Sequence, residues 1–289
     1  MYRAILTIAC GDASDRPALQ SACALAATGR AVVRVLPVLP DLVGQLAALG
    51  SETGAIIPQD VYDGLIEARA ATHMSIVEDA RAAAAEAGLT FGEGPQSGRL
   101  MVEDLPDELR VRLANAAPLA DLVVSGQATA AGPLSDTGAF ADALLHARAP
   151  MLLARRPVSA LNGVAVIAWD GSPEAGRAVR SALPLLHQAK RVAIVQCPHG
   201  LKPLLQDAAR PERLTHFLSL HGIAAAAGGM GEGRSGGEGE CRLEAAKTQE
   251  ADLLVAGAYG HWRLFETLFG GATRSFLDAE SGPNLFLAH

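Results

Sequence analysis

One short aliphatic pattern occurs twice in this chain and constrains its fold more than any other feature. Residues 120–126 read Ala-Asp-Leu-Val-Val-Ser-Gly, and residues 251–257 read Ala-Asp-Leu-Leu-Val-Ala-Gly. Each copy has the length of a buried strand and ends in a glycine that permits a turn. A chain of 289 residues is long enough for two domains of about 150 residues each. The repeat therefore indicates two similar domains joined in tandem.

Further aliphatic runs occupy corresponding places in the two halves. They cover residues 4–9, 31–35 and 150–154 in the first half, and residues 164–168, 191–195 and 283–288 in the second. Strands that alternate with Ala-rich helical stretches indicate βαβ units and a parallel sheet. We expect two flavodoxin-like (Rossmann-like) α/β domains, residues 1–157 and 158–289. Each should be a five-stranded, mainly parallel sheet with helices on both faces.

Composition supports this fold and excludes several classes of function. Hydrophobic residues make up 49% of the chain and aromatic residues only 4%, so aliphatic side chains must fill the cores. The net charge is −7 and no block of basic residues occurs, which argues against nucleic-acid binding. No apolar run approaches the roughly 20 residues that a membrane helix needs.

The four cysteines are Cys10, Cys23, Cys197 and Cys241, and none belongs to a C-x-x-C pair. Because scattered cysteines fit neither a zinc site nor a disulfide framework, we expect reduced thiols, no metal site and a cytoplasmic location.

The two halves differ in what separates their strands. The first half has a long insertion, in which residues 59–87 have the apolar spacing of one long helix. In the second half, seven of the twelve residues at 228–239 are glycine, which predicts a loop. Residues 228–235 formally resemble a P-loop, and residues 231–236 a dinucleotide fingerprint. We reject both matches because the required strand and helix context and the P-loop lysine are missing.

The most informative motif follows the repeated strand of the second half. Gly257 and Gly260 are followed by nine residues and then by Gly270 and Gly271. Glycines at a strand end let a ligand approach the backbone closely. The second glycine pair precedes a helical run that includes Thr273 and Arg274, and the N-terminus of such a helix favours a phosphate. Ligands bind at the carboxyl ends of strands in open α/β sheets.

This pattern resembles the nucleotide signature of the universal stress protein family, which reads G-x-x-G, nine residues, then G-[ST]. Gly257, Gly260 and Gly270 match it at the correct spacing, and Asp170 matches the acidic residue that the family places near the adenosine. The resemblance covers nearly all of residues 162–289 and extends to residues 1–156 in outline. We expect Ser172 to cap the following helix, which would leave Asp170 free for a ligand.

The chain departs from the family pattern at two places. Gly271 stands where the signature has Ser or Thr, so Thr273 or Arg274 would have to compensate near the phosphates. In the first half, the equivalent of Asp170 falls at Cys10 or Gly11, and the run after Gly126 lacks the second glycine. We therefore expect the N-terminal domain to have lost nucleotide binding.

The resemblance implies a stress-response regulator or sensor whose C-terminal domain binds an adenine nucleotide (ATP, ADP or AMP), with or without Mg²⁺. It also implies an intrachain pseudo-dimer that pairs residues 151–154 with residues 284–288, a homodimer of such chains, and a protein partner. No catalytic residue is identifiable, so at most a weak ATPase activity is expected.

Two alternatives stay open. The first is a nucleotide-free dimeric scaffold that acts through protein contacts. The second is a nucleotide-hydrolysing or adenylating enzyme, for which only His261 and Glu266 lie near the phosphate motif in sequence.

Overall fold

The computed structural model describes residues 1–94, 96–105, 109–131, 139, 142–158, 163–197, 207–230, 238–258 and 282–289. The strands of the first half are β1 (Ala4–Ala9), β2 (Val32–Pro37), β3 (Thr90–Phe91), β4 (Arg99–Val102), β5 (Leu122–Ser125) and β6 (Met151–Leu153). Those of the second half are β7 (Val164–Ala168), β8 (Arg191–Gln196), β9 (Ala225–Met230), β10 (Ala251–Gly257) and β11 (Asn284–Ala288).

The described strands form one sheet of 11 strands in the order β3-β4-β2-β1-β5-β6-β11-β10-β7-β8-β9. The order β4-β2-β1-β5-β6 in the first half repeats as β9-β8-β7-β10-β11 in the second, and all pairs within a half are parallel. The predicted α/β fold is thus confirmed. The first half differs from expectation by one short edge strand, β3, which pairs with β4.

The two halves join through their last strands, as expected from the sequence. Strands β6 and β11 pair in antiparallel fashion, with Phe286 opposite Leu152. This pairing buries two apolar strands that would otherwise be exposed sheet edges. The fully buried Asn284 fixes the junction: its Oδ1 accepts the N–H groups of Arg155 and Arg156 at 2.9 and 3.0 Å, and its Nδ2 donates to the Arg156 carbonyl.

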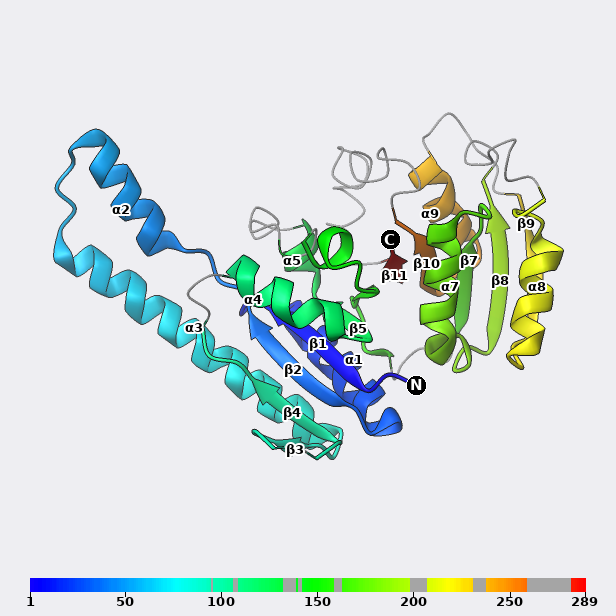
Figure 1. Cartoon of the computed structure of the whole chain (residues 1–289), viewed down its shortest axis with the longest axis horizontal. Coiled ribbons are helices and arrows are strands. Elements are labelled where there is room, and N and C mark those ends of the chain that lie inside the picture. The colour runs from blue at the N-terminus through cyan, green and yellow to red at the C-terminus, as the bar shows by residue number, and fades with distance from the viewer. Residues whose placement is uncertain are drawn as a thin grey trace.

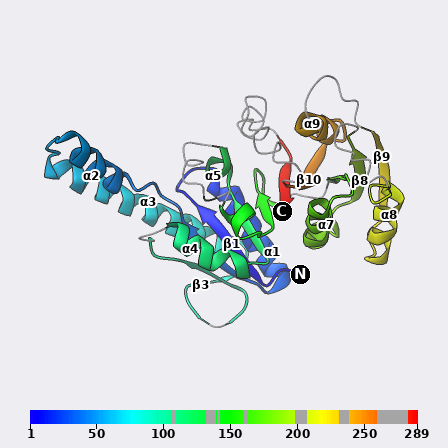
Figure 2. The same ribbon diagram turned by 45° about the horizontal axis from the view of Figure 1, so that its top comes forward.

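Helices cover both faces of the sheet (Figures 1 and 2). In the first half they are α1 (Asp15–Gly29), α2 (Leu42–Thr53), α3 (Gln59–Glu86), α4 (Leu109–Ala116), η1 (Ala117–Leu119), α5 (Gln127–Ala131) and η3 (Asp142–His146). In the second half they are α7 (Pro173–Leu186), α8 (Pro211–Leu220) and α9 (Glu238–Thr248). Buried side chains of α1, α3, α7 and α8 form one core, and those of α4, η3 and α9 form a second core on the opposite face.

Helix α3 confirms the long helix predicted for the insertion. Together with α2 it projects from the first half in both views of the molecule (Figures 1 and 2). Helix α2 has no buried residue, and α3 buries side chains only from Ile76 onward, where it packs on α1 and the sheet. The projecting part is thus an exposed arm of residues 42–71.

The glycine-rich stretch at 228–239 is not a loop over its whole length. Residues 228–230 complete β9, which pairs with β8, and residues 238 and 239 begin α9. Ladder hydrogen bonds use backbone groups alone, so glycines can occupy a strand despite their low intrinsic preference for it. Residues 231–237 lie outside the described part of the chain.

Candidate functional site

The candidate site lies where the carboxyl ends of β7, β8 and β10 meet at one edge of the sheet. Asp170 follows β7 after one intervening residue, Cys197 follows β8 directly, and Gly257 ends β10. Strand β7 pairs with both β8 and β10, so these residues occupy adjacent positions. The topology therefore places Asp170 and Gly257 at one strand-end site, as the motif requires.

Asp170 is not free, contrary to the sequence expectation. Its Oδ1 accepts the backbone N–H of Ser172 at 2.9 Å, and its Oδ2 lies 3.2 Å from a guanidinium nitrogen of Arg242 on α9. The Arg242 side chain is only 8% exposed and that of Asp170 is 17% exposed. Ser172 does cap α7 as predicted, because its Oγ accepts the N–H of Ala175 at 3.1 Å. Although Ser172 caps the helix, Asp170 is still bonded to the Ser172 N–H and to Arg242, so it is not free for a ligand.

Gly257 has a packing role that the motif did not indicate. A Cβ atom at this position would lie 2.4 Å from the backbone nitrogen of Ala175, in the first turn of α7. Gly126 is the corresponding residue of the first half, and a Cβ there would lie 2.3 Å from the Ser14 carbonyl oxygen. The glycine that ends each copy of the repeat thus lets a helix N-terminus approach the sheet closely. The remaining predicted residues (Gly260, Gly270, Gly271, Thr273 and Arg274) lie outside the described residues, as do His261 and Glu266.

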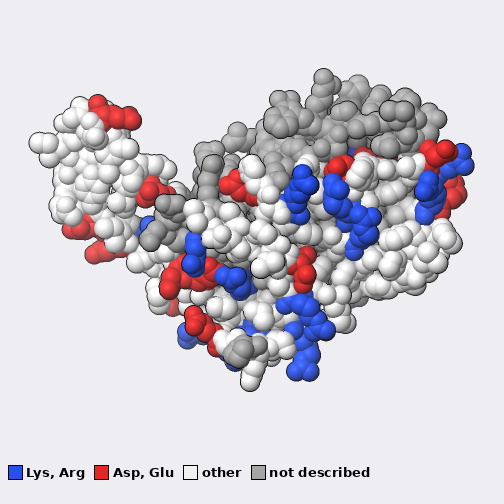
Figure 3. Space-filling view, viewed as in Figure 1, with Lys and Arg blue, Asp and Glu red and all other residues white. Residues whose placement is uncertain are grey.

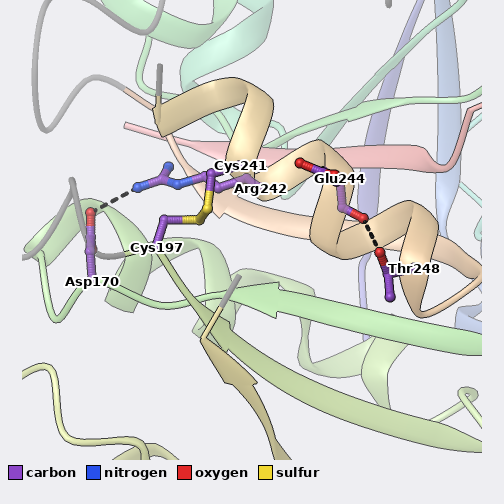
Figure 4. The surroundings of a disulfide bond; sticks show 6 residues. All are labelled: Asp170, Cys197, Cys241, Arg242, Glu244 and Thr248. Atoms are coloured by element: carbon purple, nitrogen blue, oxygen red, sulfur yellow. Dashed lines mark hydrogen bonds and ion pairs between the residues drawn. A yellow bond between two sulfur atoms is a disulfide. The ribbon is translucent and has the colours of Figure 1, made fainter. Parts of the chain in front are cut away.

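A disulfide between Cys197 and Cys241 borders the site, which corrects the expectation of four reduced cysteines (Figure 4). The two Cα atoms are 6.1 Å apart, and Cys241 directly precedes Arg242 on α9. The pairing could have been inferred from topology. Cys197 follows a strand, and Cys241 lies near the start of the helix that leads into β10, so both fall at the carboxyl edge of the sheet. Their separation of 44 residues hid this relationship in the sequence.

The other two cysteines are unpaired and buried. Burial and the neighbouring Asp15 raise the pKa of the Cys10 thiol to about 12. Burial and Glu86 raise that of Cys23 to a similar value. Because the thiolate is the reactive form, burial and the raised pKa both disfavour these thiols as nucleophiles near neutral pH.

The first half has a different arrangement at the corresponding edge. Asp12 Oδ1 accepts the N–H of Ser14 at 2.8 Å, as Asp170 does with Ser172, so Asp12 is the structural counterpart of Asp170. The sequence alone predicts this counterpart at Cys10 or Gly11. The prediction is wrong because five positions separate the end of β1 from Ser14, whereas four separate the end of β7 from Ser172. Asp12 has no ion pair with a basic side chain among the described residues.

The Asp15 carboxylate accepts hydrogen bonds from the backbone N–H groups of the loop after β1. Its Oδ2 accepts the N–H groups of Cys10 and Gly11, both at 2.7 Å, and the residue is only 2% exposed. Burial raises the pKa of Asp15 to about 6, although the two backbone hydrogen bonds act in the opposite direction. Helix α3 covers the same loop, because Thr72 packs directly on the backbone of Gly11. The loop is thus filled by the chain's own carboxylate and covered by the insertion helix.

The described residues also contain a cavity of about 450 Å³, and it does not coincide with this site. It lies between α7 and α8, next to the loop that contains Asp170. Gly171, Ser172 and Pro173 contribute to its wall, but Asp170, Cys197 and Gly257 do not. Within the described ranges, no cluster of His, Cys, Asp and Glu side chains could hold a metal ion. No described helix is long and apolar enough to cross a membrane.

No protein-family model and no curated protein matches this sequence. Among solved structures, a universal stress protein from Archaeoglobus fulgidus covers 99% of this chain and 96% of its own, with a TM-score of 0.61 at 16% identity. The chain has the universal stress protein fold. The fold resemblance predicted from its residues is thereby confirmed.

Two further universal stress proteins align with less than half of the chain. One, from Burkholderia pseudomallei, is 24% identical over 44% of this chain and 96% of its own, with a TM-score of 0.31. The other, solved in complex with cAMP, is 18% identical over 45% of this chain and 99% of its own, with a TM-score of 0.30. Both TM-scores are low, so these two structures support no further conclusion about this chain.

Proposed function

We propose that this protein is a stress-response regulator or sensor that binds one adenine nucleotide (ATP, ADP or AMP) in its C-terminal half. The observation that carries the proposal is the position of Asp170. Its carboxylate lies at the end of β7, beside the end of β10, where the G-x-x-G-x9-G motif begins. A carboxylate at a strand end of such a sheet is suited to accept hydrogen bonds from ribose hydroxyls.

Nucleotide binding would have to displace one contact of Asp170. The N–H of Ser172 is part of the tight turn before α7 and stays with Oδ1. Arg242 is a side-chain donor on another element, so a ribose hydroxyl can take its place at Oδ2. The phosphates would then lie against Gly260, Gly270 and Gly271, with Thr273 and Arg274 at the following helix. Those five positions rest on the sequence motif.

The N-terminal half does not take a nucleotide in this proposal. Asp15 already accepts the N–H groups at the end of β1, and its carboxylate repels a phosphate when ionised. Thr72 of α3 covers Gly11 in the same loop. The half therefore serves as the structural partner of the nucleotide-binding half.

A homodimer is the assembly that we propose, and the α2–α3 arm supports it. Five of its large apolar side chains are exposed: Leu42, Leu49, Ile56, Val61 and Ile66. Figure 3 shows that much of the arm's visible surface is uncharged, with acidic side chains at a few places. Exposed apolar side chains of this kind mark a contact with another protein, and we assign that contact to the arm of a second copy of the chain. Sedimentation analysis of the wild type and of an Ile56→Glu variant tests this assignment.

The location that we propose is the cytoplasm, and the mode of action is ligand-dependent contact with a partner protein rather than catalysis. The disulfide tests the location directly. The structure contains the Cys197–Cys241 bond, but a cytoplasm kept reducing by glutathione and thioredoxin would reduce it. Thiol trapping in intact cells, followed by mass spectrometry, should therefore find both cysteines as free thiols. A fully oxidised pair in unstressed cells would contradict a cytoplasmic location.

The first experiment measures the nucleotide itself. Freshly purified protein is denatured, and the released small molecules are separated by anion-exchange chromatography. A parallel sample receives ATP with and without Mg²⁺, and calorimetry then compares ATP, ADP, AMP and cAMP. About one nucleotide per chain supports the proposal. The number of phosphates on that nucleotide shows whether ATP, ADP or AMP binds when Gly271 stands in place of Ser or Thr. A protein that is purified without nucleotide and does not bind millimolar ATP would favour the nucleotide-free scaffold.

A further inference from the structure

The cavity between α7 and α8 has apolar walls and a basic rim. Val179 of α7 faces Leu214 and Phe217 of α8, and Trp169 contributes at the end of β7. Arg180 and Arg213 also line it, and both residues are exposed. Figure 3 shows basic and acidic side chains together toward one end of α7 and of α8, with uncharged surface between them. Its volume of about 450 Å³ is in the range of small-molecule sites.

The polar groups that line the cavity are mostly hydrogen-bond donors. The indole Nε1 of Trp169 is buried and has no hydrogen-bond partner. Arg213 donates to the backbone oxygen of Asp207 at 3.4 Å, which leaves most of its donors unused. The Arg180 guanidinium lies over Gly176, with one nitrogen 3.4 Å from the position of a Cβ atom there. No Asp or Glu is among the described residues that line the cavity.

The acidic side chains nearby are already paired with other arginines. Glu174 binds Arg177 at 2.8 Å, and Asp207 binds Arg210 at 2.8 Å. No described ion pair involves Arg180 or Arg213. Among the described residues, Arg180 and Arg213 thus have no ion-pair partner beside this apolar cavity, in a protein whose net charge is −7. Such a local excess of donors and positive charge selects an acceptor that is anionic.

From this geometry we infer that the cavity binds a small amphipathic anion, namely a monocarboxylate with an aliphatic or aromatic body. The body lies against Val179, Leu214 and Phe217, and the carboxylate lies at Arg180 and Arg213. The site is separate from the proposed nucleotide site, since Asp170 and Gly257 do not line it. The inference therefore stands whether or not the chain binds a nucleotide.

The test compares octanoate with 1-octanol, which have the same chain length but differ in charge. The chain has two tryptophans, so a Trp262→Phe variant makes the fluorescence specific for Trp169. Calorimetry on the wild-type protein measures the same binding without a spectroscopic label. We expect saturable octanoate binding that is about tenfold tighter than 1-octanol binding, because the charged head group adds charge-assisted hydrogen bonds.

Three variants assign the site. Arg180→Gln should weaken octanoate binding by about tenfold and leave 1-octanol binding unchanged. Gly176→Leu should remove binding of both compounds, because its side chain extends into the cavity from a helical position with no close neighbour except Arg180. Arg16→Gln alters an exposed arginine on α1 and is the matched control, for which no change is expected. Circular dichroism confirms that each variant is folded.

Three results would overturn the inference. The first is no binding of octanoate by either method. The second is equal affinity for octanoate and 1-octanol, which would mean that the arginines do not select an anion. The third is octanoate binding that survives Gly176→Leu in a folded protein, which would place the ligand elsewhere. Gly260→Val, in the sequence motif for the nucleotide, should leave octanoate binding intact, so failure of the proposed nucleotide site is distinguishable from failure of this one.

Discussion

Asp170 and Arg242 form an ion pair across the candidate site, with 3.2 Å between Oδ2 and the guanidinium nitrogen. Asp170 comes from the loop after β7 and Arg242 from the first half of α9, next to the disulfide-bonded Cys241 (Figure 4). The carboxylate that the sequence motif assigns to a nucleotide is thus held by a cation of its own chain. A ligand must compete with this pair, and only groups with a better fit to Asp170 will displace Arg242.

Replacing Asp170 by alanine should weaken nucleotide binding by at least tenfold, because a hydrogen bond to a charged group contributes about 1.5–3 kcal/mol. Calorimetry with ATP measures the effect. Asp12→Ala is the matched control, since Asp12 makes the equivalent contact with Ser14 in the first half. Equal losses in both variants would mean that the carboxylates act through loop structure, or that both halves bind nucleotide.

Substituting Gly257 or Gly126 by alanine should destabilise the fold by about 1–3 kcal/mol each, the usual cost of overpacking. The added Cβ would lie 2.4 Å or less from the backbone at the start of α7 or α1, and backbone cannot move aside cheaply. Urea unfolding measures the change. Gly64→Ala provides the contrast, because a Cβ in this part of α3 meets nothing within 4 Å and should stabilise the helix by about 0.5–1 kcal/mol. Similar effects at all three positions would contradict the packing role.

Reducing the Cys197–Cys241 bond should lower the free energy of unfolding by about 2–4 kcal/mol, because the bond closes a long loop in the unfolded chain. Urea unfolding with and without a phosphine reductant measures this difference. The double variant Cys197→Ser and Cys241→Ser should be insensitive to the reductant. Persistent sensitivity in that variant would implicate Cys10 or Cys23, the buried unpaired thiols.

Asp15 should make the protein more stable as the pH falls from 7 toward 4. Its native pKa of about 6 lies above the ordinary value, so the folded protein holds the proton more tightly than the unfolded chain. The gain is complete below the unfolded pKa near 4 and is lost as the pH rises through 6. Compared with Asp15→Asn, the wild type should gain up to about 3 kcal/mol over this range. Parallel curves for the two proteins would show that the Asp15 pKa is not raised.

Much of the fold could be predicted from local sequence. The aliphatic runs gave eight of the strands in roughly the right places, because buried parallel strands need continuous apolar residues. The long helix α3 followed from its apolar spacing. Strand β9 (Ala225–Met230) was missed because its alanines and glycines carry no strand preference, and only pairing with β8 stabilises it. Helix α2 was not predicted, and it buries no residue.

The candidate site was predictable only in part. The sequence by itself determined the strand-end positions of Asp170 and Gly257 and the capping role of Ser172, since these depend on short-range geometry at a strand end. The tertiary structure decided the partners: Arg242 with Asp170, Cys197 with Cys241, and Asp15 with the loop after β1. Asp15 is close in sequence, but burial by the surrounding core is what turns it toward the backbone. The other two pairs join residues that lie 72 and 44 positions apart, and no local pattern encodes contacts that the folded sheet creates.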